Sequence, residues 1–137
     1  MSRLIALLLA TSIATGCGVG VTKRTRIESA GVTTGDTLTL ASAVVYECEP
    51  RDTTSEFWLS AAKKKRCLKS SAGVTRYDKL LGNIAPGTSA RISSIKYING
   101  IDAVFHLAYL QVAGIDGQLV VYEFDLPKLL QAPQDGR

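Results

Sequence analysis

The chain has 137 residues with a formal net charge of +4; 46% of its residues are hydrophobic and 20% are charged. This length predicts one domain, and the composition excludes a disordered polar tract. So mild a positive charge predicts only a weak preference for anionic surfaces.

The N-terminus combines one positive charge with an apolar run. Arg3 is the only charge in the first 22 residues, and Leu4 to Ile13 form an apolar run of signal-peptide length. Small residues from Ala14 to Gly16 then lead to Cys17. This stretch resembles the lipobox of bacterial lipoproteins, although Ala14 stands where that family usually has leucine.

The resemblance implies cleavage by signal peptidase II between Gly16 and Cys17, with a diacylglycerol on the Cys17 sulfur. Gly18, in place of aspartate, points to sorting to the outer membrane. Two alternatives stay open. One is an ordinary signal peptide, because small residues recur before Cys17. The other is an uncleaved helix, because Leu4 to Thr22 carries no charge and could span a bilayer.

Four segments follow from this interpretation. Residues 1–16 are the expected signal peptide, and residues 17–36 the lipidated N-terminus and a flexible tether rich in Gly, Thr and Ser. Residues 37–126 are the expected β domain, and residues 127–137 a C-terminal tail with a short helical turn.

Two basic groups are candidate contacts for an anionic surface, and a solvated linker and loop are the competing interpretation. One group lies close to the expected anchor and the other in the body of the chain. They are Lys23, Arg24 and Arg26, and then Lys63, Lys64, Lys65 and Arg66.

The first half of the body predicts a strand and then an ambiguous segment. Residues 37–49 alternate in polarity, which predicts a strand with Cys48 on its apolar side, ended by Pro50. Over residues 53–70 we favour a short helix, because Thr53 and Glu56 fit a capping box. A strand–turn–strand with the basic cluster at its tip is the alternative.

Strand signals dominate the second half. Asn99-Gly100 and Asp116-Gly117 predict hairpin turns. Residues 101–113 are apolar at both odd and even positions (on both parities), as in a central strand that is buried on both faces. The fold class is therefore mainly β: a small antiparallel barrel or sandwich, with room for one short helix.

The three cysteines divide between leader and body. Cys48 and Cys67 both lie in the body, so the simplest count pairs them in a disulfide and leaves Cys17 for the lipid. A disulfide requires an oxidising compartment such as the bacterial periplasm.

His106, the only histidine, lies in an apolar strand and predicts a structural rather than a catalytic residue. The sequence indicates no catalytic set, no metal-ligand set and no cofactor motif, and export argues against nucleic acid as a partner. We therefore expect a non-catalytic binding or structural module in the periplasm, held to the outer membrane by its lipid and partnered by another envelope protein. The alternative is an inhibitor or exclusion factor, directed at lysozyme, phage or plasmid entry.

Overall fold

The computed structural model describes residues 20–58, 61–100 and 102–131. The expected signal peptide, Gly16 and Cys17 lie outside these residues. Within the described ranges, no helix has both the length and the apolar character needed to cross a membrane.

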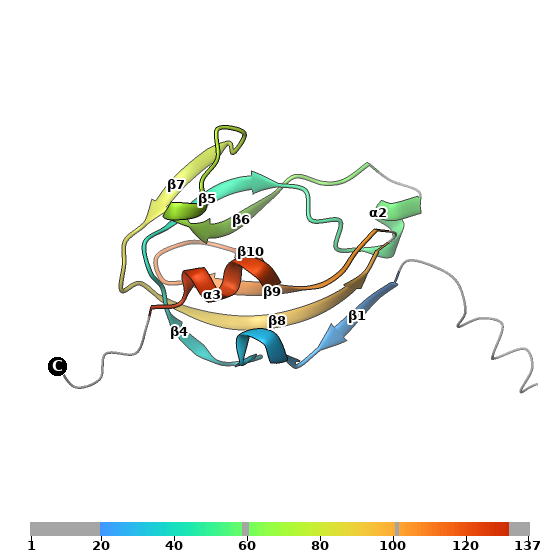
Figure 1. The fold of residues 1–137 in the computed structure, drawn as a ribbon, viewed down its shortest axis with the longest axis horizontal. Coiled ribbons are helices and arrows are strands. Elements are labelled where there is room, and N and C mark those ends of the chain that lie inside the picture. The colour runs from blue at the N-terminus through green and yellow to red at the C-terminus, as the bar shows by residue number, and fades with distance from the viewer. Residues whose placement is uncertain (1–19, 59–60, 101, 132–137) are drawn as a thin grey trace, which may run out of the picture.

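Strands make up most of the described chain (Figure 1). The strands are β1 (Gly20–Arg24), β2 (Arg26–Ile27), β3 (Val32–Thr33), β4 (Thr37–Thr39), β5 (Ala43–Cys48), β6 (Lys65–Ser70), β7 (Leu80–Ile84), β8 (Ser89–Asn99), β9 (Val104–Val112) and β10 (Gln118–Tyr122). The helices are α2 (Thr54–Trp58) and α3 (Leu126–Leu129), with single 3-10 turns η1 (Glu28–Ala30), η2 (Ser71–Gly73) and η3 (Glu123–Asp125).

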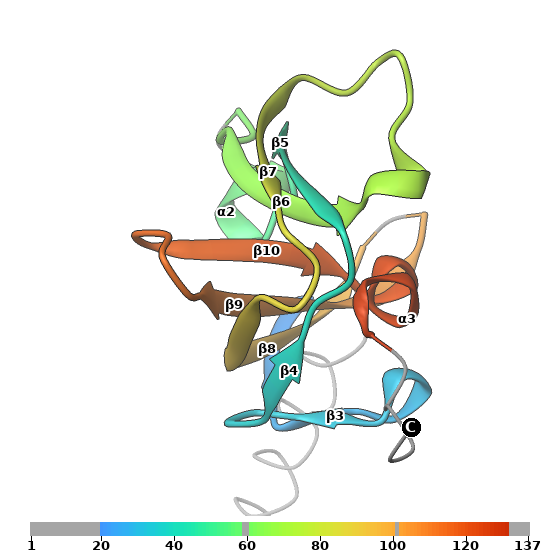
Figure 2. The same ribbon diagram turned by 90° about the vertical axis from the view of Figure 1, so that its left-hand side faces the viewer.

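An eight-stranded sheet forms the body, in the order β1-β8-β9-β10-β6-β5-β7, with β4 also paired to β8. All neighbours are antiparallel except β6 and β10, which are parallel and meet at one pair, Val120 opposite Cys67. Figures 1 and 2 show β5, β6 and β7 lying above the layer of β8, β9 and β10. The mainly β fold is confirmed, and the sheet does not close into a barrel.

Two hydrophobic clusters lie on opposite faces of the central strands. In β9, Ala108 and Leu110 belong to the larger cluster, whereas Leu107 and Tyr109 belong to the smaller one. Side chains of a strand alternate between faces, so a strand buried on both faces must be apolar on both parities. The central position predicted for residues 101–113 is thus confirmed for the β9 part of that range.

A bulge in β8 changes which side chains reach the larger cluster. The register with β9 shifts between Ile92 and Ser94, so Ser93 is the extra residue. Ile92 and Ile95, although of opposite parity, are therefore both buried in the same cluster. The Ser93 hydroxyl donates to the Tyr109 carbonyl oxygen at 2.9 Å, which holds the bulge.

The predicted flexible tether is wrong for residues 20–36. Gly20 to Arg24 form β1, which pairs with β8 from Asn99 to Ile95, and β2 and β3 follow as a small hairpin. Ile27 is fully buried in the larger cluster. A polar edge strand needs only backbone pairing with its neighbour, so it carries no apolar alternation by which the sequence could have revealed it.

The short helix is confirmed only for residues 54–58. The basic run continues into β6 rather than into a helix, and the Thr53 hydroxyl pairs with the Ser55 hydroxyl at 3.2 Å instead of capping the helix. The start of the expected tail is also packed rather than free, because Leu126 and Leu129 of α3 are fully buried.

Both predicted hairpins form. In the β8–β9 connection, the Gly100 N–H donates to the Ala103 carbonyl oxygen at 2.9 Å. The β9–β10 turn contains Gly117 at φ 77°, a left-handed conformation that favours glycine.

Candidate functional site

The Cys48–Cys67 disulfide is confirmed. It joins the end of β5 to the middle of β6 with a Cα–Cα distance of 5.8 Å. Cys67 is fully buried in the smaller cluster, so the bond fixes the point where the chain leaves the sheet after β5.

The predicted basic run does not form a single positive patch. Lys64 Nζ lies 3.2 Å from Glu47, Lys65 Nζ lies 2.6 Å from the buried Asp52, and Arg66 donates to the Asp116 carbonyl oxygen. Lys65 and Arg66 are successive residues of β6, so their side chains point to opposite faces of the strand, while Lys64 precedes it. Lys63 is exposed in the preceding loop.

The first basic group follows β1 and β2 along an edge of the sheet. Lys23 is exposed, and Arg26 pairs with Glu28 at 3.2 Å. The Arg24 guanidinium lies 5.0 Å from the centre of the Tyr97 ring, where a cation is attracted to the aromatic face.

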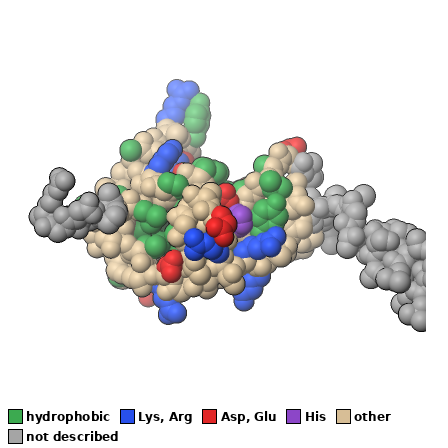
Figure 3. Space-filling view, turned by 60° about the horizontal axis from the view of Figure 1, so that its bottom comes forward, with side chains coloured by type: hydrophobic (Ala, Val, Ile, Leu, Met, Phe, Trp, Pro, Cys, Tyr) green, Lys and Arg blue, Asp and Glu red, His purple; other side chains and the backbone are tan. Residues whose placement is uncertain are grey.

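His106 lies on the same face of β9 as Ala108 and Leu110, near the start of the strand, where its side chain is partly exposed. Its backbone N–H donates to Glu123 Oε1 at 3.0 Å, and its ring Nδ1 contacts the same oxygen. The Tyr97 ring centre lies 5.1 Å from the imidazole. In Figure 3 the purple histidine lies beside acidic and basic side chains on this face. His106 is thus a partly exposed strand residue held by Glu123, a partner that the sequence did not indicate.

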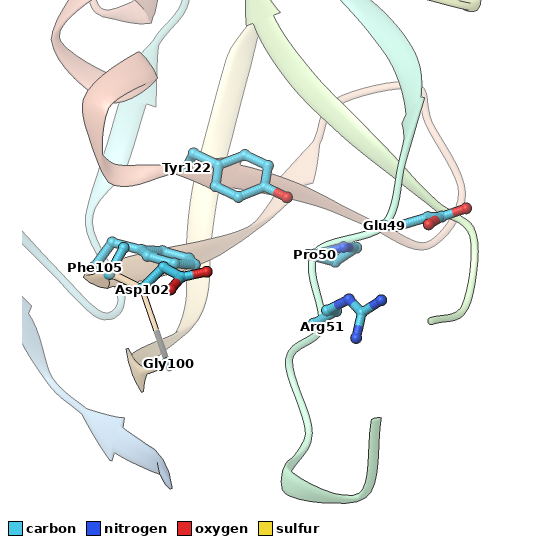
Figure 4. A pocket seen from close by; sticks show the side chains of 8 residues that line it. Glu49, Pro50, Arg51, Gly100, Asp102, Phe105 and Tyr122 are labelled. Carbon is cyan, nitrogen blue, oxygen red and sulfur yellow. The ribbon is translucent and has the colours of Figure 1, made fainter. Parts of the chain in front are cut away.

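The described residues also contain a pocket that the sequence did not predict. It has a volume of about 350 Å³. The β5–α2 linker and the β8–β9 loop form two of its walls, and β9 and β10 contribute one aromatic residue each (Figure 4). We call it the linker–loop pocket; its lining is Glu49, Pro50, Arg51, Gly100, Asp102, Ala103, Phe105 and Tyr122.

Two aromatic rings form the apolar wall of the linker–loop pocket. Phe105 and Tyr122 have ring centres 5.8 Å apart at a tilted angle of 41°. Tyr122 pairs with Leu107, so Phe105 is its diagonal neighbour on the same face of two adjacent strands. Burial, followed by the nearby charges of Asp125, Asp52 and Glu49, raises the pKa of Tyr122, so its hydroxyl stays neutral at physiological pH.

Three charged side chains surround the linker–loop pocket without an ion pair among the described residues. They are Glu49, Arg51 and Asp102, all exposed. Figure 4 shows Arg51 on one side of the cavity, and Asp102 with Phe105 on the other. The linker side of the cavity therefore carries both Arg51 and the Glu49 carboxylate, and the opposite side combines the Asp102 carboxylate with an aromatic ring.

Arg51 is held in an unfavourable backbone conformation. Its φ is 48°, the only positive φ of a described residue other than glycine. A side chain in the left-handed region costs about 1–2 kcal/mol, and such strain persists where the surrounding structure imposes it. Here the Arg51 side chain donates to the Glu56 carbonyl oxygen at 3.4 Å, and the next residue is anchored in the interior.

Asp52 is that anchor. It is 1% exposed, and its carboxylate accepts hydrogen bonds from Lys65 at 2.6 and 2.7 Å and from the Tyr109 hydroxyl. Lys96 Nζ lies 3.9 Å from the same carboxylate and donates to the Asp52 carbonyl oxygen. Burial raises the pKa of Asp52, but the hydrogen bonds from Lys65 and Tyr109 together bring it below its usual range.

The linker is therefore fixed from both ends. The disulfide at Cys48 holds its start, and the charge cluster around Asp52 holds its end. Glu49, Pro50 and Arg51 lie between these two points, so this wall of the pocket is formed before any ligand arrives.

Local sequence signals for the pocket were weak because its lining comes from separate parts of the chain. The useful signals were Phe105 and Tyr122, aromatic residues near the ends of predicted strands, and Pro50 after the cysteine. Comparison of the chain with protein-family models, with curated proteins and with solved structures finds no match.

Proposed function

We propose that this chain is a lipid-anchored, non-catalytic binding module of the bacterial outer membrane, with its β domain in the periplasm. The lipobox-like stretch that ends in Gly16 and Cys17 supports the anchor. The linker–loop pocket is the proposed binding site for a component of the cell envelope.

The pocket is the observation that carries the binding role. Two aromatic rings and three charged groups free of ion pairs with the described residues surround one cavity of about 350 Å³. Ligand sites commonly combine such an apolar lining with a few polar groups that fix the orientation of the ligand. A preformed linker wall also reduces the entropy lost when a ligand binds.

Mass spectrometry of the protein from native membranes tests the anchor. We expect a chain that begins at Cys17 and carries a diacylglycerol on that residue, with Cys48 and Cys67 oxidised. A chain that begins at Met1, or one cut elsewhere and free of lipid, would contradict the anchor.

Crosslinking in cells tests the binding site. A photo-crosslinking residue replaces Ala103 at the pocket rim or, as a matched control, Ala85 near the opposite end of β8; both positions are exposed. We expect a specific crosslinked product from position 103 only, and a smaller yield when Phe105→Ala is added. Tyr77→Ala, which removes an 80% exposed aromatic outside the pocket, should leave the yield unchanged. Equal crosslinking from positions 85 and 103 would refute the assignment.

A further inference from the structure

The linker–loop pocket lies at the end of the sheet from which the chain leads back to Cys17. Gly20, the first residue of β1, is paired with Asn99, and the next residue along β8, Gly100, lines the pocket. An extended chain spans about 3.3–3.6 Å per residue, so the three steps from Gly20 to Cys17 cover about 10 Å at most.

This short reach fixes which end of the domain faces the bilayer. A lipid on Cys17 would hold the β8–β9 loop at the level of the phospholipid headgroups, and this step rests on the proposed anchor. Val104, directly after that loop, is 58% exposed and adds an apolar contact suited to the interface. The pocket rim would then lie where headgroups are the most abundant ligand.

The charges of the pocket match a ligand that carries both signs. Arg51 presents a guanidinium on the linker side, which it shares with the Glu49 carboxylate, and guanidinium groups bind phosphate through paired hydrogen bonds. Asp102 and Phe105 lie on the other side, and a carboxylate beside an aromatic face attracts an ammonium group. The neutral Tyr122 hydroxyl can donate to a phosphate oxygen as well.

We propose that the linker–loop pocket binds the zwitterionic phosphoethanolamine headgroup of a membrane phospholipid. The phosphate lies against Arg51, and the ammonium group lies between Asp102 and the ring of Phe105. The domain thereby rests on its membrane through two contacts, the lipid on Cys17 and a headgroup in the pocket.

A titration followed by NMR of the Gly100 and Asp102 amides tests this chemistry. The protein is purified from its native membranes and held in nanodiscs of phosphatidylglycerol. Soluble glycerophosphoethanolamine should give saturable shifts at both amides. Ethanolamine or inorganic phosphate alone should bind at least about tenfold more weakly, because each lacks one of the two charge-assisted contacts. Equal binding of inorganic phosphate would refute recognition of the zwitterion.

Nanodiscs distinguish the bilayer from a soluble source of the same headgroup. Phosphatidylethanolamine in the nanodisc should shift the two amides without any added probe. If only the soluble probe shifts them, the proposal that the ligand is a bilayer lipid is wrong.

Variants link the shifts to the proposed contacts. Arg51→Gly should keep the fold, because glycine adopts positive φ freely, and should weaken glycerophosphoethanolamine binding about tenfold or more. Asp102→Asn should remove the advantage of glycerophosphoethanolamine over inorganic phosphate. Asp116→Asn, an exposed charge in another loop, is the control and should bind normally. Normal binding by both Arg51→Gly and Asp102→Asn would refute the site.

The experiments distinguish failure of the headgroup proposal from failure of the proposed lipid anchor. If Cys17 carries lipid and glycerophosphoethanolamine gives no shift, headgroup recognition is refuted while the anchor stands. If Cys17 carries no lipid but the probe binds, the anchor is refuted while the pocket chemistry stands.

Discussion

The charge cluster around Asp52 gives the sharpest test of how the linker is held. Asp52→Asn keeps the shape of the side chain but removes its charge, which leaves Lys65 and Lys96 without their shared partner. Breaking a fully buried ion pair costs about 3–5 kcal/mol. The side chains of Lys65 and Lys96 are 32% and 34% exposed, so water can partly replace Asp52. We therefore expect a loss near the lower limit, about 3 kcal/mol.

Urea unfolding at pH 7, followed by circular dichroism with the disulfide intact, measures this loss. A change of this size corresponds to a fall in Tm of about 10 °C for a domain of this length. Asp116→Asn serves as the control and should change stability little. A loss below about 1 kcal/mol for Asp52→Asn would refute the view that the cluster holds the linker.

The difference in stability between wild type and Asp52→Asn depends on pH. The pKa of Asp52 is lowered in the folded protein, while an unfolded aspartate titrates at about 3.9. The stabilisation from Asp52 is therefore complete above about pH 4 and is lost as the pH falls through the folded pKa. The difference between wild type and Asp52→Asn should shrink in acid. A difference that persists unchanged at strongly acidic pH would contradict the charge-based explanation.

Three further outcomes follow from the fold. Replacing both disulfide cysteines by alanine should cost roughly 3 kcal/mol and make thermal unfolding insensitive to reductant; a reductant-sensitive double variant would contradict the assignment. Gly117→Ala should cost about 1–2 kcal/mol in urea unfolding, because Gly117 has φ 77° and its added Cβ would lie 2.8 Å from the Arg66 side chain. Gly82→Ala, with open space around it, is the control, and equal losses would contradict the reasoning. Burial raises the pKa values of Tyr46 and Tyr109, so stability should fall as the pH rises above about 10, where unfolded tyrosine ionises. Absorbance at 295 nm should show these two tyrosines ionising only with unfolding, and their ionisation in the folded protein would refute this.

Strand periodicity predicted the elements that depend on local patterning. Alternation identified the strand that ends at Cys48, and apolar residues on both parities identified β9 as central. The disulfide followed from counting cysteines. Each of these features depends on a short stretch of sequence or on a count of residues, so it could be predicted without knowledge of distant contacts.

The features that were missed depend on contacts between distant segments. Lys65 looked like one of several exposed cations, because nothing near it in the sequence reveals the buried Asp52 that it meets. The strand β1 looked like a linker, since its structure comes from pairing with β8. The linker–loop pocket was missed for the same reason, because Arg51, Asp102 and Tyr122 become neighbours only when the whole sheet forms.

The parallel contact between β6 and β10 has a mechanical consequence. Backbone pairing joins the two halves of the sheet at one residue pair, Val120 and Cys67, and the disulfide lies within one half rather than across this boundary. Side-chain packing, rather than a hydrogen-bond ladder, therefore carries most of the cohesion between the halves. The two outer edges of the sheet belong to different halves, since β1 lies in one and β7 in the other. Tension applied between these two edges would separate the halves along this boundary. The strands within each half would stay paired.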